Sequence, residues 1–187
     1  FRDPQLPRSP DWCDELPIEN FDAILADTRW AEGCGRAMAL ARKYNLPGVL
    51  DAEAPLEGCE EALELASHVA FSDQGLRDFN GDDLADASRR LGGFCCVTRG
   101  ERGVDFIGEE DDDIGHLPSA SVEAIETLGA GDVWHGAFTL AVAQSKSIQD
   151  ALKFANCAAA LKVSRRGGRA SYPTYDQVIS LLKGQSA

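Results

Sequence analysis

The chain has 187 residues, of which 44% are apolar and 26% charged, so it is long enough to bury a substantial core as one soluble domain. Acidic residues outnumber basic ones by 31 to 18, and the net charge of -13 opposes binding to nucleic acid or to an anionic membrane surface. No apolar stretch reaches the roughly 18 residues of a membrane helix, and the first residues do not form a signal peptide, which predicts a cytoplasmic protein.

The first half of the chain alternates between short apolar runs and helical patterns. Residues 1–17 hold four of the eight prolines, so this segment is predicted to be a connection that leaves an element absent from the sequence. An apolar run at 21–26, a helical pattern at 31–44 and a short run at 47–50 then predict a strand-helix-strand unit.

The same alternation continues towards the middle of the chain. The predicted elements are a helix at 59–66, a strand at 68–71, a helix at 82–91 and a strand at 94–98. Strands that alternate with helices predict a mostly parallel sheet covered on both faces. The six cysteines form no CxxC pair and have no histidine at a zinc spacing, and the adjacent Cys95 and Cys96, in an apolar run, are interpreted as reduced thiols in or near the core.

The second half of the chain has a different rhythm. Residues 104–107 and 114–117 predict an antiparallel hairpin at an edge of the sheet, and the acidic run 109–113 between them is interpreted as a solvated turn. Helical patterns follow, at 130–144, 148–163 and 175–182.

The most informative stretch is Glu126–Phe138, which contains the turn Gly129-Ala130-Gly131-Asp132 directly before an apolar helix. The glycines permit a tight turn, and amide N–H groups at a helix start, together with the helix dipole, favour a phosphate. Asp132 lies in the first turn, where its carboxylate can accept a hydroxyl proton. These residues alone fit equally well a helix cap without a ligand. A P-loop and a dinucleotide-binding fingerprint are excluded, because their glycine spacings are absent.

The stretch 126–140 closely resembles the C-terminal signature of the PfkB (ribokinase-like) carbohydrate kinases. Three further segments agree with that family in order and spacing. They are Cys96–Val104, which is similar to a strand end beside the nucleotide, the helix 154–160, which is similar to a small-residue helix beside the adenine, and the turn 165–168 that follows it. The resemblance covers nearly the whole chain.

The resemblance implies a three-layer α/β/α sandwich, with Mg-ATP as phosphoryl donor and a small sugar as acceptor. By this similarity Asp132 is the catalytic base and contacts the acceptor, while the amides of Gly129, Ala130 and Gly131 form an anion hole. The nucleotide-binding residues that it implies are Thr98, Gly100 and Gly103 at the phosphates and ribose and Asn156 near the base. It also implies a homodimer of the full-length protein.

Some of these residues also fit a purely structural role. Thr98 can end a strand, Gly103 can supply a hairpin turn, and Asn156 can be a satisfied polar residue of the core. Trp134 and His135, on the helix after Asp132, are predicted to be packing residues.

Two departures from the family pattern affect the expected site. Many members carry Asn-x-x-Glu after the middle strand, whereas this chain reads Phe71–Gly75, in which Ser72 is similar to the ketohexokinase and sulfofructose kinase branch. Asp73 is a candidate to hold magnesium through a bound water. The N-terminal half of the family fold and its lid are predicted to be missing.

Arg29 is a further candidate for substrate binding. It follows a predicted strand, where ligands of open parallel sheets collect, and it is a cation in an acidic protein. Its guanidinium can clamp a phosphoryl group or an anionic acceptor, or it can form an ordinary surface ion pair. The sequence thus predicts the ATP-binding and catalytic part, residues 1–187, of a sugar kinase; the alternative is a non-catalytic nucleotide- or sugar-binding module of the same fold.

Overall fold

The computed structural model describes residues 9–108 and 113–185. Within them the strands form one sheet in the order β1-β2-β3-β4-β5-β6, in which β1 to β4 are parallel and β5 and β6 are antiparallel to their neighbours. The strands are β1 (Ile24–Asp27), β2 (Gly48–Ala52), β3 (His68–Ser72), β4 (Phe94–Thr98), β5 (Val104–Ile107) and β6 (Ile114–Leu117).

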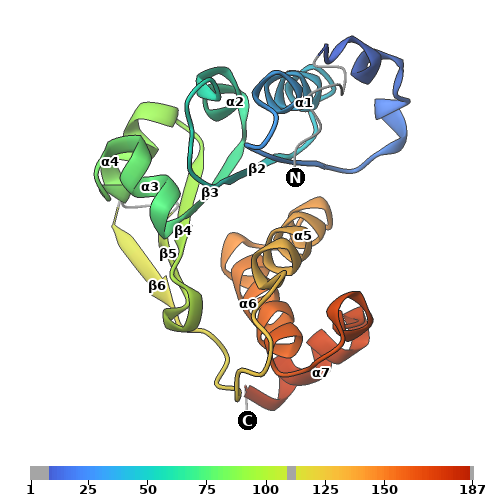
Figure 1. Ribbon diagram of the computed structural model, residues 1–187, viewed down its shortest axis with the longest axis vertical. Coiled ribbons are helices and arrows are strands. Elements are labelled where there is room, and N and C mark those ends of the chain that lie inside the picture. Colours follow the sequence, from blue (N-terminus) through green and yellow to red (C-terminus); the bar gives the residue numbers. More distant parts are fainter. Residues whose placement is uncertain (1–8, 109–112, 186–187) are drawn as a thin grey trace.

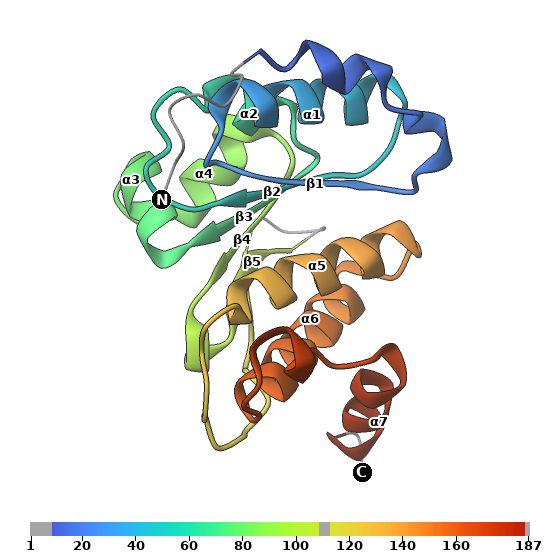
Figure 2. The same ribbon diagram turned by 45° about the vertical axis from the view of Figure 1, so that its right-hand side comes forward.

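Helices lie on both sides of this sheet. They are α1 (Ala31–Lys43), α2 (Glu60–Leu65), α3 (Asp73–Asn80), α4 (Leu84–Leu91), α5 (Ala130–Ala143), α6 (Ile148–Val163) and α7 (Tyr175–Gln185). Figures 1 and 2 show α1 to α4 on one face of the sheet and α5 and α6 on the other, with α7 packed outside α6. The predicted three-layer α/β/α arrangement with a mostly parallel sheet is therefore confirmed.

The alternation of side chains along each strand divides the core in two. On β3, Val69 and Phe71 join the apolar cluster under α1 to α4, whereas Ala70 joins the cluster under α5 to α7. Cys95 and Cys96 on β4 face opposite clusters in the same way. All six cysteines are buried free thiols, and for Cys95 and Cys96 the sequence predicts this.

Most predicted elements are found within a few residues of their expected limits, and one α-helix of the described residues has no counterpart among them. The strand predicted at 21–26 begins only at Ile24, and the helix predicted from residue 82 begins at Leu84, after Asp83 accepts a hydrogen bond from the amide of Asp86 at 2.8 Å. Helix α3 was not predicted. The hairpin of β5 and β6 at the sheet edge is confirmed.

Two segments discussed above lie partly outside the described residues: 1–8 of the opening connection and 109–112 of the acidic run. Among the helices that are described, none is long and apolar enough to cross a membrane.

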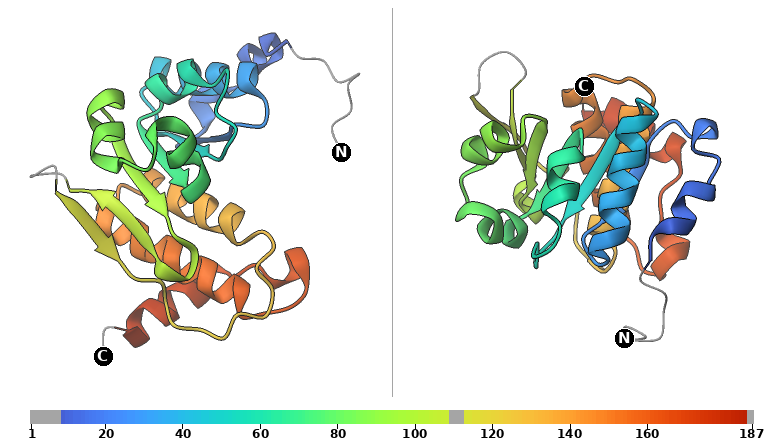
Figure 3. Two further views of the ribbon diagram at one scale, coloured as in Figure 1. Left: turned by 60° about the vertical axis from the view of Figure 1, so that its left-hand side comes forward. Right: turned by 90° about the horizontal axis from the view of Figure 1, so that it is seen from above.

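The parallel register brings the carboxyl ends of β1 to β4 to one edge of the sheet. Asp27 of β1 is the neighbour of Asp51 in β2, and Ser72 of β3 is the neighbour of Thr98 in β4. Figure 3 shows the loops that leave these strand ends. Since ligands of open α/β sheets bind beyond the carboxyl ends of the strands, this edge is where the site is expected.

Candidate active site

The glycine turn forms the start of α5. Gly129 is the N-cap residue and has a left-handed conformation with φ of 78°, which glycine adopts without strain. The first bond of the helix runs from the amide of Val133 to the carbonyl oxygen of Gly129 at 3.1 Å. Asp132 lies in the first turn, as predicted.

Several amides of this turn are free to bind an anion. Within the described residues, the N–H groups of Gly129, Gly131 and Asp132 have no hydrogen-bond acceptor, whereas that of Ala130 donates to the carbonyl oxygen of Thr127 at 3.1 Å. Of the three amides expected in the anion hole, two are therefore available in this structure. The amide of Asp132 is a third, which the sequence did not indicate.

The carboxylate of Asp132 is exposed and has no hydrogen-bond or ion-pair partner in the part of the chain that the structure describes. It lines a shallow hollow of about 350 Å³ together with Gly136 and Tyr172. A Cβ atom built on Gly129 would lie 3.8 Å from its Oδ2, so the carboxylate is close to the glycine turn. An unpaired carboxylate beside unpaired amides is suited to accept a proton next to a bound anion.

A larger cavity of about 650 Å³ lies between the sheet and the helices α5 and α6. Its lining includes six of the predicted site residues, which come from distant parts of the sequence: Thr98, Gly100, Gly103, Ala130, Gly131 and Asn156. Gly129, Asp132 and Arg29 are not part of this lining. The structure thus brings the predicted nucleotide-binding residues together around one cavity. The turn that carries Asp132 lies at the edge of this cavity.

The glycines in the loop between β4 and β5 have positive φ angles. Gly103 has φ of 95°, and a Cβ atom there would lie 2.1 Å from the carbonyl oxygen of Leu117 and 2.7 Å from the amide nitrogen of Ser119. A structural role of Gly103 is therefore evident alongside its place in the cavity. Thr98 ends β4, and its hydroxyl donates to the carbonyl oxygen of Phe71 at 3.3 Å.

Asn156 is buried, and its amide is held by the protein. Its Oδ1 accepts a hydrogen bond from Nε1 of Trp134 at 2.8 Å, and its Nδ2 donates to the carbonyl oxygen of Pro118 at 3.0 Å. Asn156 is thus a satisfied polar residue of the core and at the same time part of the cavity wall. Trp134 itself also lines the cavity, although the sequence predicted only a packing role for it. The available signal was spacing, because Trp134 is one helical turn after Ala130 and shares its face of α5.

The loop at 119–124 supplies much of the remaining wall of the cavity and was also missed. It has no periodicity that would indicate a role. The helix segment 154–160, which the family resemblance implied, contributes Asn156, Ala159 and Ala160 to the lining, and Val163 continues the same face at helical spacing.

Several carboxylates lie close together at the carboxyl ends of β1 and β2. Burial raises the pKa of Asp51, and the nearby carboxylates of Glu53, Asp27 and Asp132 raise it further, while His135 opposes them. Nδ1 of the buried His135 lies 3.3 Å from Oδ2 of Asp51 and 2.8 Å from the carbonyl oxygen of Gly131. His135 thus links α5 to the end of β2, in agreement with the packing role predicted for it.

Arg29 lies in the turn after β1, at the same edge. Its guanidinium pairs with the carboxylate of Glu53, and the two side chains are 56% and 48% exposed. Its backbone N–H donates to Oδ1 of Asp27 at 2.8 Å. This geometry agrees with an exposed ion pair, one of the two alternatives that the sequence left open.

Asp73, the candidate for water-mediated magnesium binding, is engaged by arginines. One carboxylate oxygen pairs with Nη1 of Arg99, and the other lies 3.2 Å from Nη2 of Arg102. Arg99 also bonds Asp82 at 2.9 Å and Asp105 at 3.1 Å. Because both oxygens of Asp73 face cations, this carboxylate does not fit a magnesium ligand.

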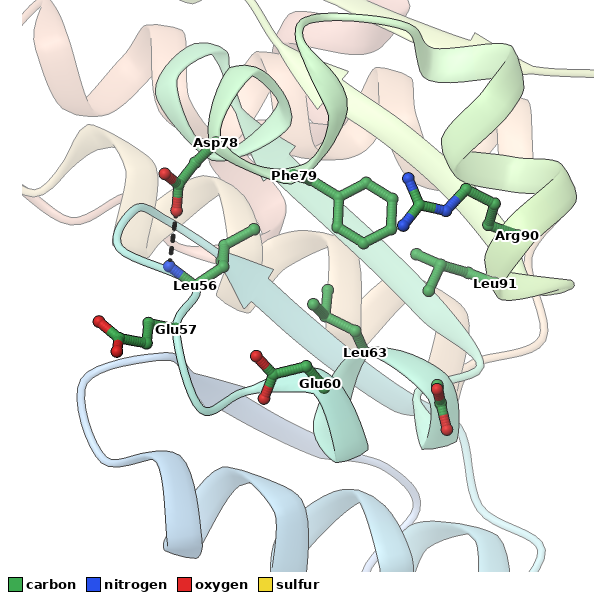
Figure 4. Close-up of a pocket in the computed structure, with 9 residues that line it drawn as sticks. Leu56, Glu57, Glu60, Leu63, Asp78, Phe79, Arg90 and Leu91 are labelled. Carbon is green, nitrogen blue, oxygen red and sulfur yellow. Dashed lines mark hydrogen bonds between the residues drawn. The ribbon is translucent and has the colours of Figure 1, made fainter.

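A separate hollow of about 460 Å³ lies among α2, α3 and α4, on the other face of the sheet (Figure 4). Figure 4 shows carboxylates of Glu57, Glu60 and Asp78 around it, and the guanidinium of Arg90 lies 4.5 Å above the ring of Phe79. Oδ2 of Asp78 accepts a hydrogen bond from the amide of Leu56 at 2.8 Å. An acidic rim repels a polyphosphate, so this hollow does not compete with the cavity beside α5.

Comparison with known proteins identifies relatives of this chain. The model of the pfkB family of carbohydrate kinases matches residues 2–175. A ribokinase of Haemophilus influenzae is 37% identical over 180 residues, which cover 90% of this chain and 58% of that protein. A crystal structure from Agrobacterium tumefaciens, of a protein provisionally named a ribokinase, has 30% identity and a TM-score of 0.82 over 96% of this chain and 60% of that one.

The Arabidopsis thaliana ribokinase complexed with ribose and ATP has a TM-score of 0.75 at 22% identity, over 89% of this chain and 57% of that one. That similarity shows the fold. In each of these three comparisons the chain spans less than two thirds of the length of its relative.

Proposed function

Because this chain belongs to the pfkB family of carbohydrate kinases, we propose that it is the nucleotide-binding and catalytic part of an ATP-dependent sugar kinase. One observation carries the proposal. The cavity lined by Thr98, Gly103 and Asn156 opens onto the unpaired amides at the start of α5, and the unpaired carboxylate of Asp132 lies in the same turn.

The proposed reaction transfers the γ-phosphoryl group of ATP to a hydroxyl group of a small sugar or sugar derivative. Asp132 accepts the hydroxyl proton, the sugar oxygen forms a bond to the γ-phosphorus, and the bond from that phosphorus to the β,γ-bridging oxygen breaks, so that ADP leaves. The amides of Gly129 and Gly131, with the positive end of the α5 dipole, stabilise the charge on the transferring group. Ala130 belongs to the same turn and contributes its backbone shape.

The proposal includes a magnesium ion that would bind together with ATP and partly neutralise the charge of its phosphates. It usually keeps several waters and is bound through substrate phosphates and one or two carboxylates. The engagement of Asp73 by Arg99 and Arg102 opposes a role for that residue.

The identity of the acceptor is a finer proposal. Ser72 supports the ketohexokinase and sulfofructose kinase branch, although its hydroxyl here accepts the amide N–H of Gly75 at 2.9 Å and caps α3. Homodimer formation and a cytoplasmic location belong to the same proposal. They rest on the family resemblance and on the sequence.

The test is ADP release by the full-length protein with Mg-ATP and a panel of ketoses, aldopentoses, sugar phosphates and sulfosugars. We expect one acceptor class to stimulate turnover, and Asp132→Asn to lower kcat by about 10²–10⁴-fold, because the base is lost. The matched control is Asp176→Asn, which removes an exposed carboxylate from the first turn of α7. If no acceptor stimulates turnover, or if the two variants behave alike, the kinase proposal with this base is wrong, and nucleotide binding without turnover would point to the non-catalytic alternative.

Arg29 is proposed to contact an anionic acceptor after exchanging its bond to Glu53. In the same assay, Arg29→Glu is expected to raise the KM of sugar phosphates or sulfosugars and to leave that of neutral sugars unchanged, since only anionic groups gain from the guanidinium. An unchanged KM for every anionic acceptor would leave Arg29 as a surface ion pair.

A further inference from the structure

Lys162, in the last turn of α6, is a lysine whose side chain is completely buried. A buried ammonium group is unfavourable unless it is paired and hydrogen-bonded. Its Nζ lies 3.3 Å from Oε1 of Glu126 and 3.4 Å from the backbone carbonyl oxygen of the same residue. The ammonium group of Lys162 therefore contacts both the side-chain carboxylate and the backbone carbonyl oxygen of Glu126.

Glu126 is also fastened to the end of α6 by other bonds. Its amide and that of Ile125 donate to the carbonyl oxygen of Val163 at 3.0 and 2.7 Å, which satisfies a carbonyl left free at the helix end. Its Oε2 accepts the amide N–H of Gly167 at 3.2 Å. The Gly167 amide and the Lys162 ammonium lower the pKa of the Glu126 carboxyl.

The glycine turn of the candidate active site begins at the next residue. Thr127 and Leu128 are exposed, and Leu128 is 81% exposed, so packing does little to hold them. Between Glu126 and the start of α5, the one backbone hydrogen bond found within the described residues joins the Ala130 amide to Thr127. The position of the turn therefore depends on Glu126 at one end and on α5 at the other.

We propose that Lys162 is a positioning residue. Its ammonium group holds Glu126 in place, and Glu126 in turn positions the amides of the turn up to Asp132. Its place in the last turn of α6 is electrostatically favourable, since the helix dipole is negative there. What the turn binds rests on the proposed function. The role of Lys162 in holding the turn in position is independent of the proposed function.

The first test is hydrogen exchange of the backbone amides in residues 127–132. Lys162→Met removes the cation while keeping an unbranched apolar chain, and we expect exchange in this segment to become at least tenfold faster, with β3 unchanged. Lys153→Met is the matched control, because Lys153 lies on the same helix and is exposed. Unchanged exchange in 127–132 of a folded Lys162→Met protein overturns the proposal.

If Lys162→Met does not fold, Lys162→Met/Glu126→Gln is measured instead, because it leaves no unpaired charge and keeps an oxygen for the Gly167 amide. Exchange in 127–132 must again exceed that of the wild type, and equal exchange overturns the proposal.

The second test uses turnover by the full-length protein. Lys162→Met is expected to lower kcat by about 10–100-fold with an ATP KM within threefold of wild type, since a small displacement of catalytic groups can cost about 10² in rate. Ethylammonium is expected to restore part of kcat in Lys162→Ala, whose cavity can admit it. A kcat loss that vanishes after correction for the fraction of folded protein, or an absence of rescue, counts against positioning. If the wild type shows no turnover, the kinase proposal fails, and the exchange result still decides the role of Lys162.

Discussion

A cluster of aromatic rings packs α5 against the sheet, and one of its members can titrate. The ring of Phe138 lies 5.2 Å from that of Trp134, 5.9 Å from that of Phe94 and 5.9 Å from that of His68 at the start of β3. Burial among these rings lowers the pKa of His68, because the imidazolium form is poorly solvated there. The charge state of this residue is therefore linked to stability.

The folded protein favours neutral His68, so its contribution to stability is complete above the unfolded pKa of about 6.5 and is lost as the pH falls from there through the folded pKa. We predict that the free energy of unfolding of the wild type falls more steeply between pH 7 and 5 than that of His68→Leu. Urea denaturation at several pH values measures both. Equal slopes in the two proteins would show that His68 does not titrate on unfolding in this range.

At the level of single residues, the sequence predicts site residues well when they follow one another in a motif. It predicts them poorly when folding brings them together from distant positions. Asp132 and the glycines follow one another, so their common turn was visible. Lys162 and Glu126 are far apart in the chain, and a lysine in a helical pattern suggests an exposed side chain. Only the end of α6, where both meet, identifies them as a pair.

Among the elements, α3 depends on a close approach to β2. A Cβ atom on Gly75, in the first turn of α3, would lie 1.9 Å from the carbonyl oxygen of Ala52 at the end of β2. The helix is therefore set directly against the strand that carries Asp51. Any side chain at position 75, even the methyl group of alanine, would clash with the carbonyl oxygen of Ala52, so the position requires glycine.

We predict that Gly75→Ala lowers the free energy of unfolding by about 1–3 kcal/mol, as added methyl groups in tightly packed sites do. Gly136→Ala is the control, because Gly136 lies inside α5 and its built Cβ has no atom within 4 Å apart from those of its chain neighbours and the adjacent backbone of the helix. That change is expected to stabilise the protein by about 0.5–1 kcal/mol through helix propensity. Chemical denaturation measures both, and destabilisation of the same size in both proteins would argue against the contact with Ala52.

The sequence predicted most elements because their apolar periodicity is long or their burial continuous. Strands β2, β3 and β4 are buried on both faces and read as apolar runs, and α6 has the limits expected from its pattern. Helix α3 was not predicted because it is only eight residues long and has Leu76 and Phe79 as its large apolar residues, which are too few to show a helical period. Its limits are set by the cap at Ser72 and the left-handed Gly81.

At the scale of the whole molecule, the candidate nucleotide cavity joins the sheet to one helical layer. Thr98 and Gly103 belong to the strand ends and their loop, whereas Asn156 and Ala159 belong to α6. A ligand in this cavity contacts both layers, and it binds the folded state alone. Its binding energy is therefore added to the stability of the sheet as well as to that of the helices.

We predict that ADP at about 100 times its Kd raises the free energy of unfolding by about 2.7 kcal/mol. Because both layers contact the ligand, amides of β3 and of α6 that exchange through global unfolding should gain the same protection. Ala159→Phe is expected to reduce the gain, since Ala159 lines the cavity and the larger side chain occupies part of it without removing a hydrogen bond. Native-state hydrogen exchange with and without ADP measures this. Protection confined to α6 would mean that the two layers unfold separately, and a gain retained in full by Ala159→Phe would place the nucleotide elsewhere.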